Sequence, residues 1–338
     1  MQLQSQYNTI DAMKLFMAFL VIGIHVGATF EINYTSFENY IMGIAVPFFF
    51  ICSGFFFQNR LHKSQEKESV FTRSIMGYAK LYFLWHLVYF PMDLYYFCHN
   101  NHSLYDNFTY ALRSLIFVGE LLYTWPLWYL HGLIVSIIII YLLRKCKLSL
   151  VQVWFVSIIM MLLGYYIHIV TNSHSTNDNI IVALCEGSVD IWGNADRNGP
   201  FRGFALVTTG MIIRQYIHYI KYEYLIGSIS ILLSFVLYNN SLPLHLLLSG
   251  SGIFVITASV RIKDRPIFFT FRNYSTLIYF THMYSVILVH KLCKNFIINI
   301  FQIYLIWIII FVITWIIAFL LNDLSKRRAF SWIQHFIG

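Results

Sequence analysis

Ten long runs of apolar residues, separated by polar segments, account for most of this chain. Within a run the apolar residues are continuous and do not alternate, and the runs are long enough to cross ~30 Å of hydrocarbon as helices. Lipid offers no hydrogen-bond partner to a bare backbone, which leaves helices or closed β-barrels, and the continuous runs favour helices. The pattern predicts an all-α integral membrane protein with about ten transmembrane helices, at residues 12–30, 40–59, 75–98, 126–143, 149–170, 200–218, 222–239, 242–260, 274–291 and 298–321.

The composition also indicates a lipid environment. Of the 338 residues, 58% are hydrophobic and only 11% carry a charged side chain. Roughly a quarter of the residues are charged in a typical soluble domain, so the composition excludes an ordinary soluble fold. We expect a single membrane domain over residues 1–338, in a multi-pass protein of the cell membrane, of the kind found in the bacterial cytoplasmic membrane.

Basic residues mark every second connection between the runs. They follow the second, fourth, sixth, eighth and tenth runs, at Arg60, Lys63, Lys67, Arg73, Lys80, Arg144, Lys145, Lys147, Arg214, Lys221, Arg261, Lys263, Arg265, Lys326, Arg327 and Arg328. Cytoplasmic loops are enriched in Lys and Arg, so both termini are predicted to be cytoplasmic, and segments 99–125 and 171–199 to lie outside. The net charge of +8 therefore reflects orientation and not nucleic-acid binding. Lys291 and Lys294 depart from this pattern, because they fall in a predicted outer loop.

The segment from Tyr105 to Tyr123 is too polar at its start to span a membrane. Its apolar residues Phe108, Leu112, Leu115 and Ile116 recur at helical spacing. This spacing predicts an amphipathic helix that lies on the outer surface or dips into the protein.

The cysteines and the start of the chain give no sign of metal binding or cleavage. No CxxC pair is present, which argues against zinc and redox motifs, and no metal site is expected. The five cysteines are Cys52, Cys98, Cys146, Cys185 and Cys293. The first run has no small-residue cleavage site, so it is predicted to be a transmembrane helix and not a signal peptide.

Two ionisable residues in the first run, Lys14 and His25, are the strongest candidates for chemistry, because charge inside a membrane is costly. They are 11 positions apart, which places them within ~20° of the same helix face and ~16 Å apart along the axis. Each also has a structural explanation. A lysine at an inner helix end often extends to the membrane surface, and a membrane histidine often only packs. Asp93 and Glu120 are candidate carboxylate partners for the His25 imidazole.

Five segments in order resemble the membrane-bound acyltransferase 3 family. The first, IDAMKLFMAFLVIGIHVG (10–27), fits the family pattern of Arg or Lys, ten residues and His, with Lys14 where Arg is commoner. The other four are VPFFFICSGFFF (46–57), RSLIFVG with PLWYLHGLI (113–119 and 126–134), RNGPFRGFALVTTGMII (197–213) and STLIYFTHMY (275–284). Each motif is weak alone, but together they extend the resemblance over almost the whole chain.

The resemblance implies transfer of an acyl group, usually acetyl, from cytoplasmic acyl-coenzyme A to a hydroxyl of a cell-surface sugar or related acceptor. Acyl-coenzyme A would be a co-substrate, with no permanently bound cofactor. Lys14 could pair with coenzyme A phosphates. His25 could take the proton of the acceptor hydroxyl or carry the acyl group covalently. The expected partners are membrane lipids, acyl-coenzyme A and a cell-surface glycan or similar acceptor, with an oligomer left open and no nucleic acid.

Four further residues have both a functional and a structural interpretation. Arg197, in the RNG segment, is predicted to bind the donor, with acceptor binding and loop capping left open. Arg202 begins the sixth run on its outer side and is a supporting candidate. Trp128 is explained either by an aromatic belt at the membrane interface or by stacking on a sugar. His282 resembles a family position and either packs in the core or supports the site.

A second interpretation of the chain is a transporter-like domain. The membrane domain of membrane-bound serine racemases, which is thought to move serine, resembles the same family, and a racemase domain follows it in those proteins. A membrane anchor for a partner enzyme is a third and weaker interpretation. Turnover of acetyl-coenzyme A separates the first interpretation from the other two.

Overall fold

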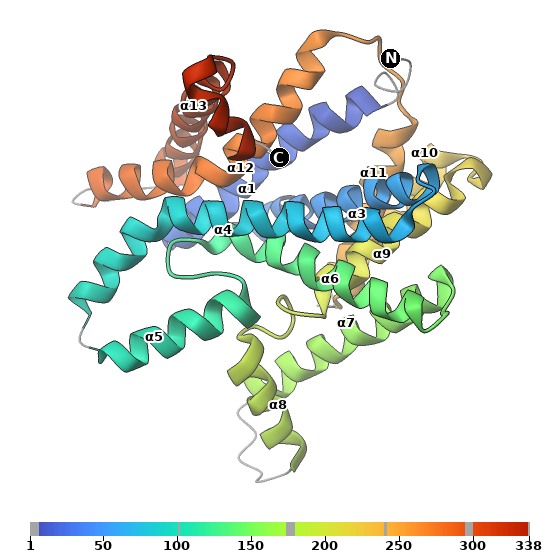
Figure 1. Ribbon diagram of the computed structural model, residues 1–338, viewed down its shortest axis with the longest axis horizontal. Helices are drawn as coiled ribbons and strands as arrows, with labels where there is room; N and C mark the ends of the chain where they lie inside the picture. Colours follow the sequence, from blue (N-terminus) through green and yellow to red (C-terminus); the bar gives the residue numbers. More distant parts are fainter. Residues whose placement is uncertain (1–6, 101, 174–179, 240–241, 295–299, 337–338) are drawn as a thin grey trace. The chain divides into compact units, whose positions relative to one another are not determined.

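The computed structural model describes residues 7–100, 102–173, 180–239, 242–294 and 300–336, in which every regular element is a helix (Figure 1). The chain forms two compact units. The first unit comprises residues 1–49 and 221–338, and the second comprises residues 50–220. The chain passes from the first unit to the second inside the helix α3 (Ala45–Lys63) and returns to the first unit after Ile220.

The first unit is built from the two ends of the chain. Besides the start of α3, its elements are α1 (Asn8–Thr29), α2 (Ser36–Gly43), α10 (Glu223–Asn239), α11 (Leu244–Ser259), α12 (Pro266–Cys293), α13 (Ile300–Leu324) and the 3₁₀ segment Arg328–Phe336. The buried side chains between α1, α12 and α13 form one hydrophobic cluster that includes Ala18, Ile22, Leu277, Ile278 and Ile310. This cluster is the hydrophobic core that positions the polar residues of α1 and α12.

The second unit contains the rest of α3 and the middle of the chain. Its helices are α4 (Lys67–His99), α5 (Leu104–Arg113), α6 (Trp128–Lys145), α7 (Leu150–Asn172), α8 (Ile180–Trp192) and α9 (Arg202–Tyr216), with short π or 3₁₀ segments at Ser114–Val118, Trp125–Leu127 and Ile217–Tyr219. A buried cluster of Ile167, Cys185, Ala195 and Phe201 ties α7 and α8 to the start of α9.

Each of the ten apolar runs coincides with helical structure, so the predicted all-α fold is confirmed. Among the residues that the structure describes, five helical stretches are long and apolar enough to cross a membrane, namely Asn8–Thr29, Ser36–Lys63, Trp125–Lys145, Leu150–Asn172 and Phe301–Leu324. The apolar helices α10 and α11 are shorter. Ten spans and cytoplasmic termini remain predictions.

The helix α8 was not predicted. It lies in the segment 171–199, which the sequence analysis assigned to an outer loop, and it is too short to cross a bilayer. The amphipathic helix predicted after Tyr105 is present as α5 and the π segment that follows it. Its apolar residues Phe108, Leu112 and Ile116 are exposed, as expected for a helix that meets lipid.

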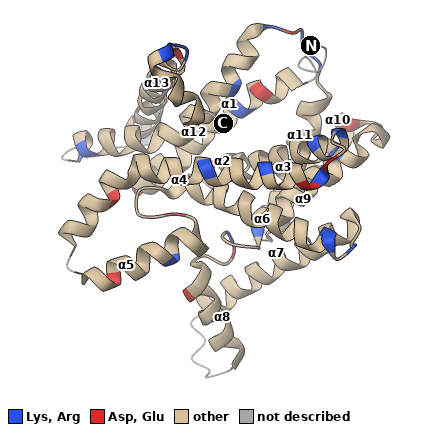
Figure 2. Cartoon of the chain, in the orientation of Figure 1, with Lys and Arg blue, Asp and Glu red and all other residues tan. Residues whose placement is uncertain are grey.

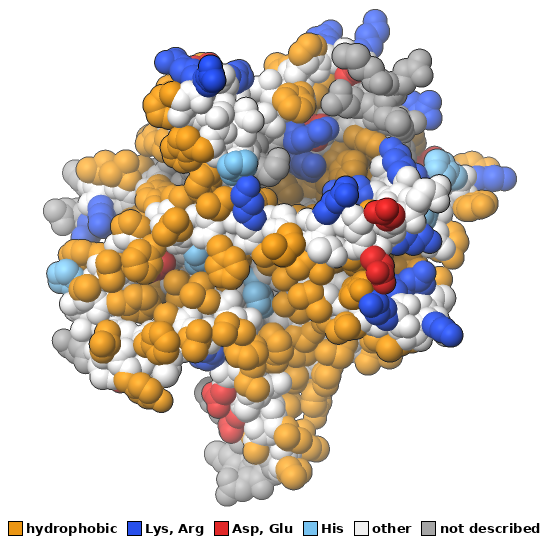
Figure 3. Space-filling model, viewed as in Figure 1, with side chains coloured by type: hydrophobic (Ala, Val, Ile, Leu, Met, Phe, Trp, Pro, Cys, Tyr) orange, Lys and Arg blue, Asp and Glu red, His pale blue; other side chains and the backbone are white. Residues whose placement is uncertain are grey.

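Exposed apolar side chains form stripes along the outer helices. On α4 the exposed residues Phe83, Leu87, Phe90 and Leu94 recur at helical spacing, and α13 carries a similar series from Phe301 to Leu320. Hydrophobic side chains cover much of the visible face in Figure 3, and Figure 2 shows long stretches of helix without a charged residue. Contiguous apolar surface of this kind needs an apolar solvent, which supports insertion in a membrane.

In the first unit, α1 and α12 run in the same direction. Three contacts follow one another along both helices, pairing Asp11 with Arg272, His25 with His282, and Phe30 with His290. The first and ninth predicted spans should run in the same direction if spans alternate, and they do.

In the second unit, neighbouring helices also have the directions that alternation requires. The helices α4 and α6 are antiparallel, since Phe71 contacts Tyr141 near one end and Tyr82 lies near His131 towards the other. The helices α7 and α9 are antiparallel as well, because Trp154 bonds to Thr209 while Gly164 lies against Phe201. The helix directions are therefore consistent with the predicted topology.

Two glycines allow α3 and α9 to pack in backbone contact. A Cβ added to Gly54 would overlap the carbonyl oxygen of Val207, and one added to Gly210 would overlap that of Ile51. Small residues at such crossings are typical of membrane helices.

We predict that Gly210→Ala destabilises the protein by about 1–3 kcal/mol, because the added methyl group forces the two helices apart. The matched control is Gly77→Ala on α4, where a Cβ would meet nothing within 4 Å. The control should be neutral or stabilising by up to about 1 kcal/mol. Thermal unfolding of both variants in detergent checks the prediction. Equal unfolding midpoints would show that the α3–α9 contact is looser than described.

Candidate active site

The first turn of α1 presents a buried carboxylate to α12. The side chain of Asp11 is only 2% exposed and accepts hydrogen bonds from Arg272, from Nε at 3.1 and 3.2 Å and from Nη2 at 2.6 Å. A carboxylate is favoured in the first turn of a helix, where unpaired N–H groups create positive potential. Bidentate Arg–carboxylate pairing also fixes the relative geometry of the two side chains. The pair therefore sets how the start of α1 lies on α12.

The same carboxylate also contacts the lysine predicted from the sequence. The Lys14 ammonium lies 3.7 Å from Asp11 Oδ1, one helical turn away, and its side chain is 19% exposed. One buried anion thus holds two cations at one end of the helix pair. Because the Arg272 side chain is 40% exposed, this end remains accessible to a charged ligand.

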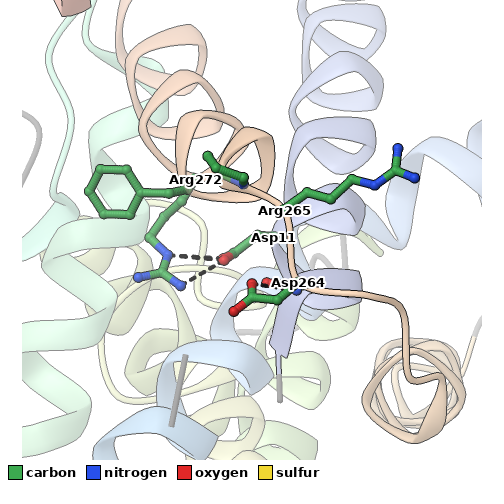
Figure 4. A pocket seen from close by; sticks show the side chains of 7 residues that line it. Asp11, Asp264, Arg265 and Arg272 are labelled. Carbon is green, nitrogen blue, oxygen red and sulfur yellow. Dashed lines mark hydrogen bonds and ion pairs between the residues drawn. The ribbon is translucent and has the colours of Figure 1, made fainter. Parts of the chain in front are cut away.

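A cavity of about 300 Å³ opens at this end of the first unit. Its lining residues are Asn8, Asp11, Asp264, Arg265, Pro266, Phe269 and Arg272. Figure 4 shows Arg272 directed at Asp11, while the Arg265 side chain extends away from that pair. Asn8 Nδ2 donates to Asp264 Oδ1 at 3.1 Å, and Thr9 Oγ1 donates to the carbonyl of Val260 at 2.8 Å. These two bonds attach the start of α1 to the segment that precedes α12.

Further along the same helices, His25 lies against His282. Their ring centroids are 5.0 Å apart, with the ring planes inclined by 45°. His25 is half-buried, whereas His282 is completely buried and lies 6.1 Å from the Tyr279 ring. The structure therefore brings together two histidines that the sequence analysis considered separately.

The charged end and the histidines are separated by an apolar stretch. Fourteen residues lead from Asp11 to His25 along α1, which corresponds to ~21 Å of helix. Ala18 and Ile22 of α1 and Leu277 of α12 belong to the fully buried core along this stretch. A ligand that used both ends would have to be long, with a charged group at one end and a reactive group at the other.

In the second unit, Arg197 is held on two sides. Its guanidinium forms an ion pair with Glu120 and lies 5.0 Å from the Trp128 ring centroid. Gly119, at φ 91°, ends the preceding π segment just before Glu120. Burial raises the pKa of the Glu120 carboxyl above its usual value, while the Arg197 guanidinium acts in the opposite direction. Arg197 is thus a fixed cation and not a mobile surface side chain.

The other predicted residues of the second unit also have partners there. Arg202 pairs with Asp196, and its buried Nε has no hydrogen-bond partner in the described part of the chain. Trp128 is buried and contacts Phe50 as well as Arg197. Asp93 accepts a hydrogen bond from the backbone N–H of Tyr123 at 3.1 Å. Asp93 and Glu120, considered as partners for His25, are therefore engaged within the second unit.

The acyltransferase 3 family, described as an acyltransferase domain, matches residues 7–323. This chain belongs to that family. The match covers helices of both compact units and includes the Lys14 and His25 positions.

A further similarity, to a racemase, is partial. An amino-acid racemase of Enterococcus faecalis is 28% identical over 164 residues, which are 47% of this chain. The aligned part is only 22% of the racemase's own length, so the similarity concerns a minor part of that protein. No solved structure matches the chain.

Lys14, His25 and His282 could be identified as candidates from the sequence, whereas Asp11 and Arg272 were not. One signal was available for Asp11, which is an ionisable residue one helical turn before Lys14, just ahead of the first apolar run. Nothing local identified Arg272, because its partner is 261 positions away in the sequence of this acyltransferase 3 protein.

We predict that Asp11→Asn destabilises the protein by about 1–3 kcal/mol, the range for hydrogen bonds to charged groups, reduced by the solvent exposure of Arg272. The control is Asp323→Asn on α13, whose ion pair with Arg327 is exposed and should contribute less than about 1 kcal/mol. Thermal unfolding in detergent compares the two variants. A loss no greater than that of the control would show that Asp11 does not hold α1 on α12.

Proposed function

We propose that this protein transfers an acetyl group from acetyl-coenzyme A, on the cytoplasmic side of a bacterial cell membrane, to a hydroxyl of a cell-surface glycan. The observation that carries the proposal is the family match over residues 7–323. Family membership supports acyl transfer to a hydroxyl. The coenzyme A donor, the glycan acceptor and the sidedness are what we propose beyond it.

The charged end of the α1–α12 pair is suited to the nucleotide part of the donor. Lys14 and Arg272 surround the Asp11 carboxylate, and the adjoining cavity is partly lined by arginine side chains. Coenzyme A carries phosphate groups, which Arg and Lys bind well. Its long pantetheine arm matches the separation between this end and His25. Lys14 and Arg272 are therefore proposed to bind the phosphates while the thioester extends towards the histidines.

We assign His25 as the general base of the transfer. Its imidazole takes the proton of the acceptor hydroxyl as the oxygen attacks the thioester carbonyl. The new C–O bond forms, the C–S bond breaks, and the departing thiolate receives the proton from His25. The products are the acetyl ester of the acceptor and free coenzyme A. The alternative, in which His25 carries the acetyl group covalently, would give an acetyl-protein intermediate that can be trapped before acceptor is added.

Arg197, in the second unit, remains a residue that we predict to bind a substrate. Its contacts with Glu120 and Trp128 support the proposal because they hold the guanidinium in one place. Arg202 and Trp128 are proposed to support that position rather than to take part in bond making.

Substitutions of His25 and Lys14 should affect different kinetic parameters. His25→Ala should lower kcat by ~100-fold to 10,000-fold, the usual range for loss of a general base. Lys14→Ala should raise the KM for acetyl-coenzyme A by roughly 10-fold, equivalent to about 1.4 kcal/mol of binding, with little change in kcat. Lys14→Arg should be tolerated, since it keeps the charge. Coenzyme A release by purified protein in proteoliposomes, with soluble cell-wall glycan fragments as acceptors, measures both parameters.

The matched control is His168→Ala, which removes a half-buried histidine of α7 that contacts Asn172. It should leave turnover unchanged. If His25→Ala folds and turns over at the wild-type rate, the catalytic assignment is wrong.

A serine carrier is the second candidate function, favoured by the partial similarity to an amino-acid racemase. Accumulation of labelled serine in the proteoliposomes, with no coenzyme A release from the wild-type protein, would establish that alternative and exclude the acetyl transfer.

A further inference from the structure

His282 lies beside His25 with one ring nitrogen unused. Its Nδ1 lies 3.1 Å from the carbonyl oxygen of Ile278, one turn earlier in α12. A carbonyl oxygen can only accept, so Nδ1 carries the proton and donates it. In a neutral imidazole the other nitrogen then bears a lone pair. That nitrogen, Nε2, is buried and has no hydrogen-bond partner among the described residues.

An unpartnered acceptor in an apolar core is costly, so its presence calls for an explanation. The His282 side chain is completely buried. The neighbouring ring that could supply an N–H is that of His25, at a centroid separation of 5.0 Å. Two imidazole rings joined by one N–H···N hydrogen bond lie at about this separation, given a heavy-atom distance of ~3 Å.

We propose that His282 is the positioning residue of the reaction centre. The rings are close enough for a turn of the His25 ring to aim its N–H at the unpartnered Nε2 of His282. In the reacting complex this hydrogen bond fixes the tautomer of His25 and leaves the other ring nitrogen as the base. This inference rests on the proposed acetyl transfer and adds the residue that orients the base.

The same contact serves His25 in both of its charge states. When His25 takes the acceptor's proton, the resulting imidazolium still donates to His282 Nε2, and a hydrogen bond from a charged donor is stronger than one from a neutral donor. His282 itself stays neutral, because two adjacent imidazolium groups would repel each other. The transferred proton therefore remains on His25, from which the leaving thiolate can take it.

The rival explanation is that His282 only packs in the core. The two explanations differ in whether leucine or glutamine replaces His282 better. In an apolar core, leucine should replace a packing residue at least as well as glutamine, because the glutamine amide would be buried without enough partners. A positioning residue is replaced better by glutamine, whose carbonyl oxygen can still accept from His25.

The experiment measures coenzyme A release and unfolding temperature for His282→Gln and His282→Leu. We expect His282→Leu to lower kcat by at least ~10-fold. This loss is smaller than the ~100-fold or greater rate increase that a general base contributes, because the base itself is still present. The KM for acetyl-coenzyme A should not change, and His282→Gln should recover most of the lost kcat. The matched control is His290→Leu, which removes another α12 histidine whose ring packs on Phe30 of α1 and should leave kcat unchanged. If His282→Leu does not fold, His282→Met, which also lacks a strong acceptor, replaces it.

Two results would overturn the inference while leaving the acetyl transfer intact. One is wild-type kcat in His282→Leu. The other is an equal loss in the leucine and glutamine variants with both folded, which would show that an acceptor at this position is not what matters. Absence of coenzyme A release from the wild-type protein would instead remove the proposed function, and this inference with it.

Discussion

A buried carboxylate cannot remain unpaired in an apolar surrounding, and this constraint organises the first unit. Asp11 is almost inaccessible to solvent, and it contacts Arg272 of α12 and Lys14 of its own helix. Removing one partner from a buried ion pair costs far more than the pair itself contributes. The three charges must therefore stay together, which fixes the level at which α1 lies on α12.

The level at which α1 lies on α12 also determines which residues meet further along the two helices. Because α1 and α12 run in the same direction, the contact between Asp11 and Arg272 near their N-terminal ends also helps to place His25 beside His282. The apolar residues between the two levels, among them Ala18, Ile22 and Leu277, keep the ionic end and the imidazole end apart. In the function proposed here, the charged part of an extended donor binds at one level and its reactive group is positioned at the other, so that the reactants are held in place for the transfer.

The sequence predicts the part of the fold that follows from backbone hydrogen bonding in lipid. Helices occur at all ten apolar runs because no other structure satisfies the backbone there. The helix α8 was missed because it is too short to span a membrane and lies between polar segments. Lys14 and His25 could be identified because ionisable residues are rare in apolar runs. Their partners could not be identified, since contacts such as that between Asp11 and Arg272 depend on tertiary packing that local periodicity does not encode.

The contacts of the candidate residues in the second unit could not be predicted either, because they also depend on tertiary packing. From the sequence, Trp128 could belong to an aromatic belt or stack on a sugar, but in the structure its ring is buried beneath Arg197. The pairing of Arg197 with Glu120 joins residues 77 positions apart. Sequence motifs indicated that these residues matter, whereas only the folded chain shows what they contact.

We propose that the donor enters at the Lys14 end of the α1–α12 pair and that this end faces the cytoplasm. The most direct test compares coenzyme A release in sealed inside-out and right-side-out membrane vesicles, because acetyl-coenzyme A does not cross a bilayer. Vesicles containing the His25→Ala variant give the background rate. We predict release from inside-out vesicles, and from right-side-out vesicles only after they are permeabilised. Equal release from sealed right-side-out vesicles would contradict the account, since the donor would then enter from the opposite side.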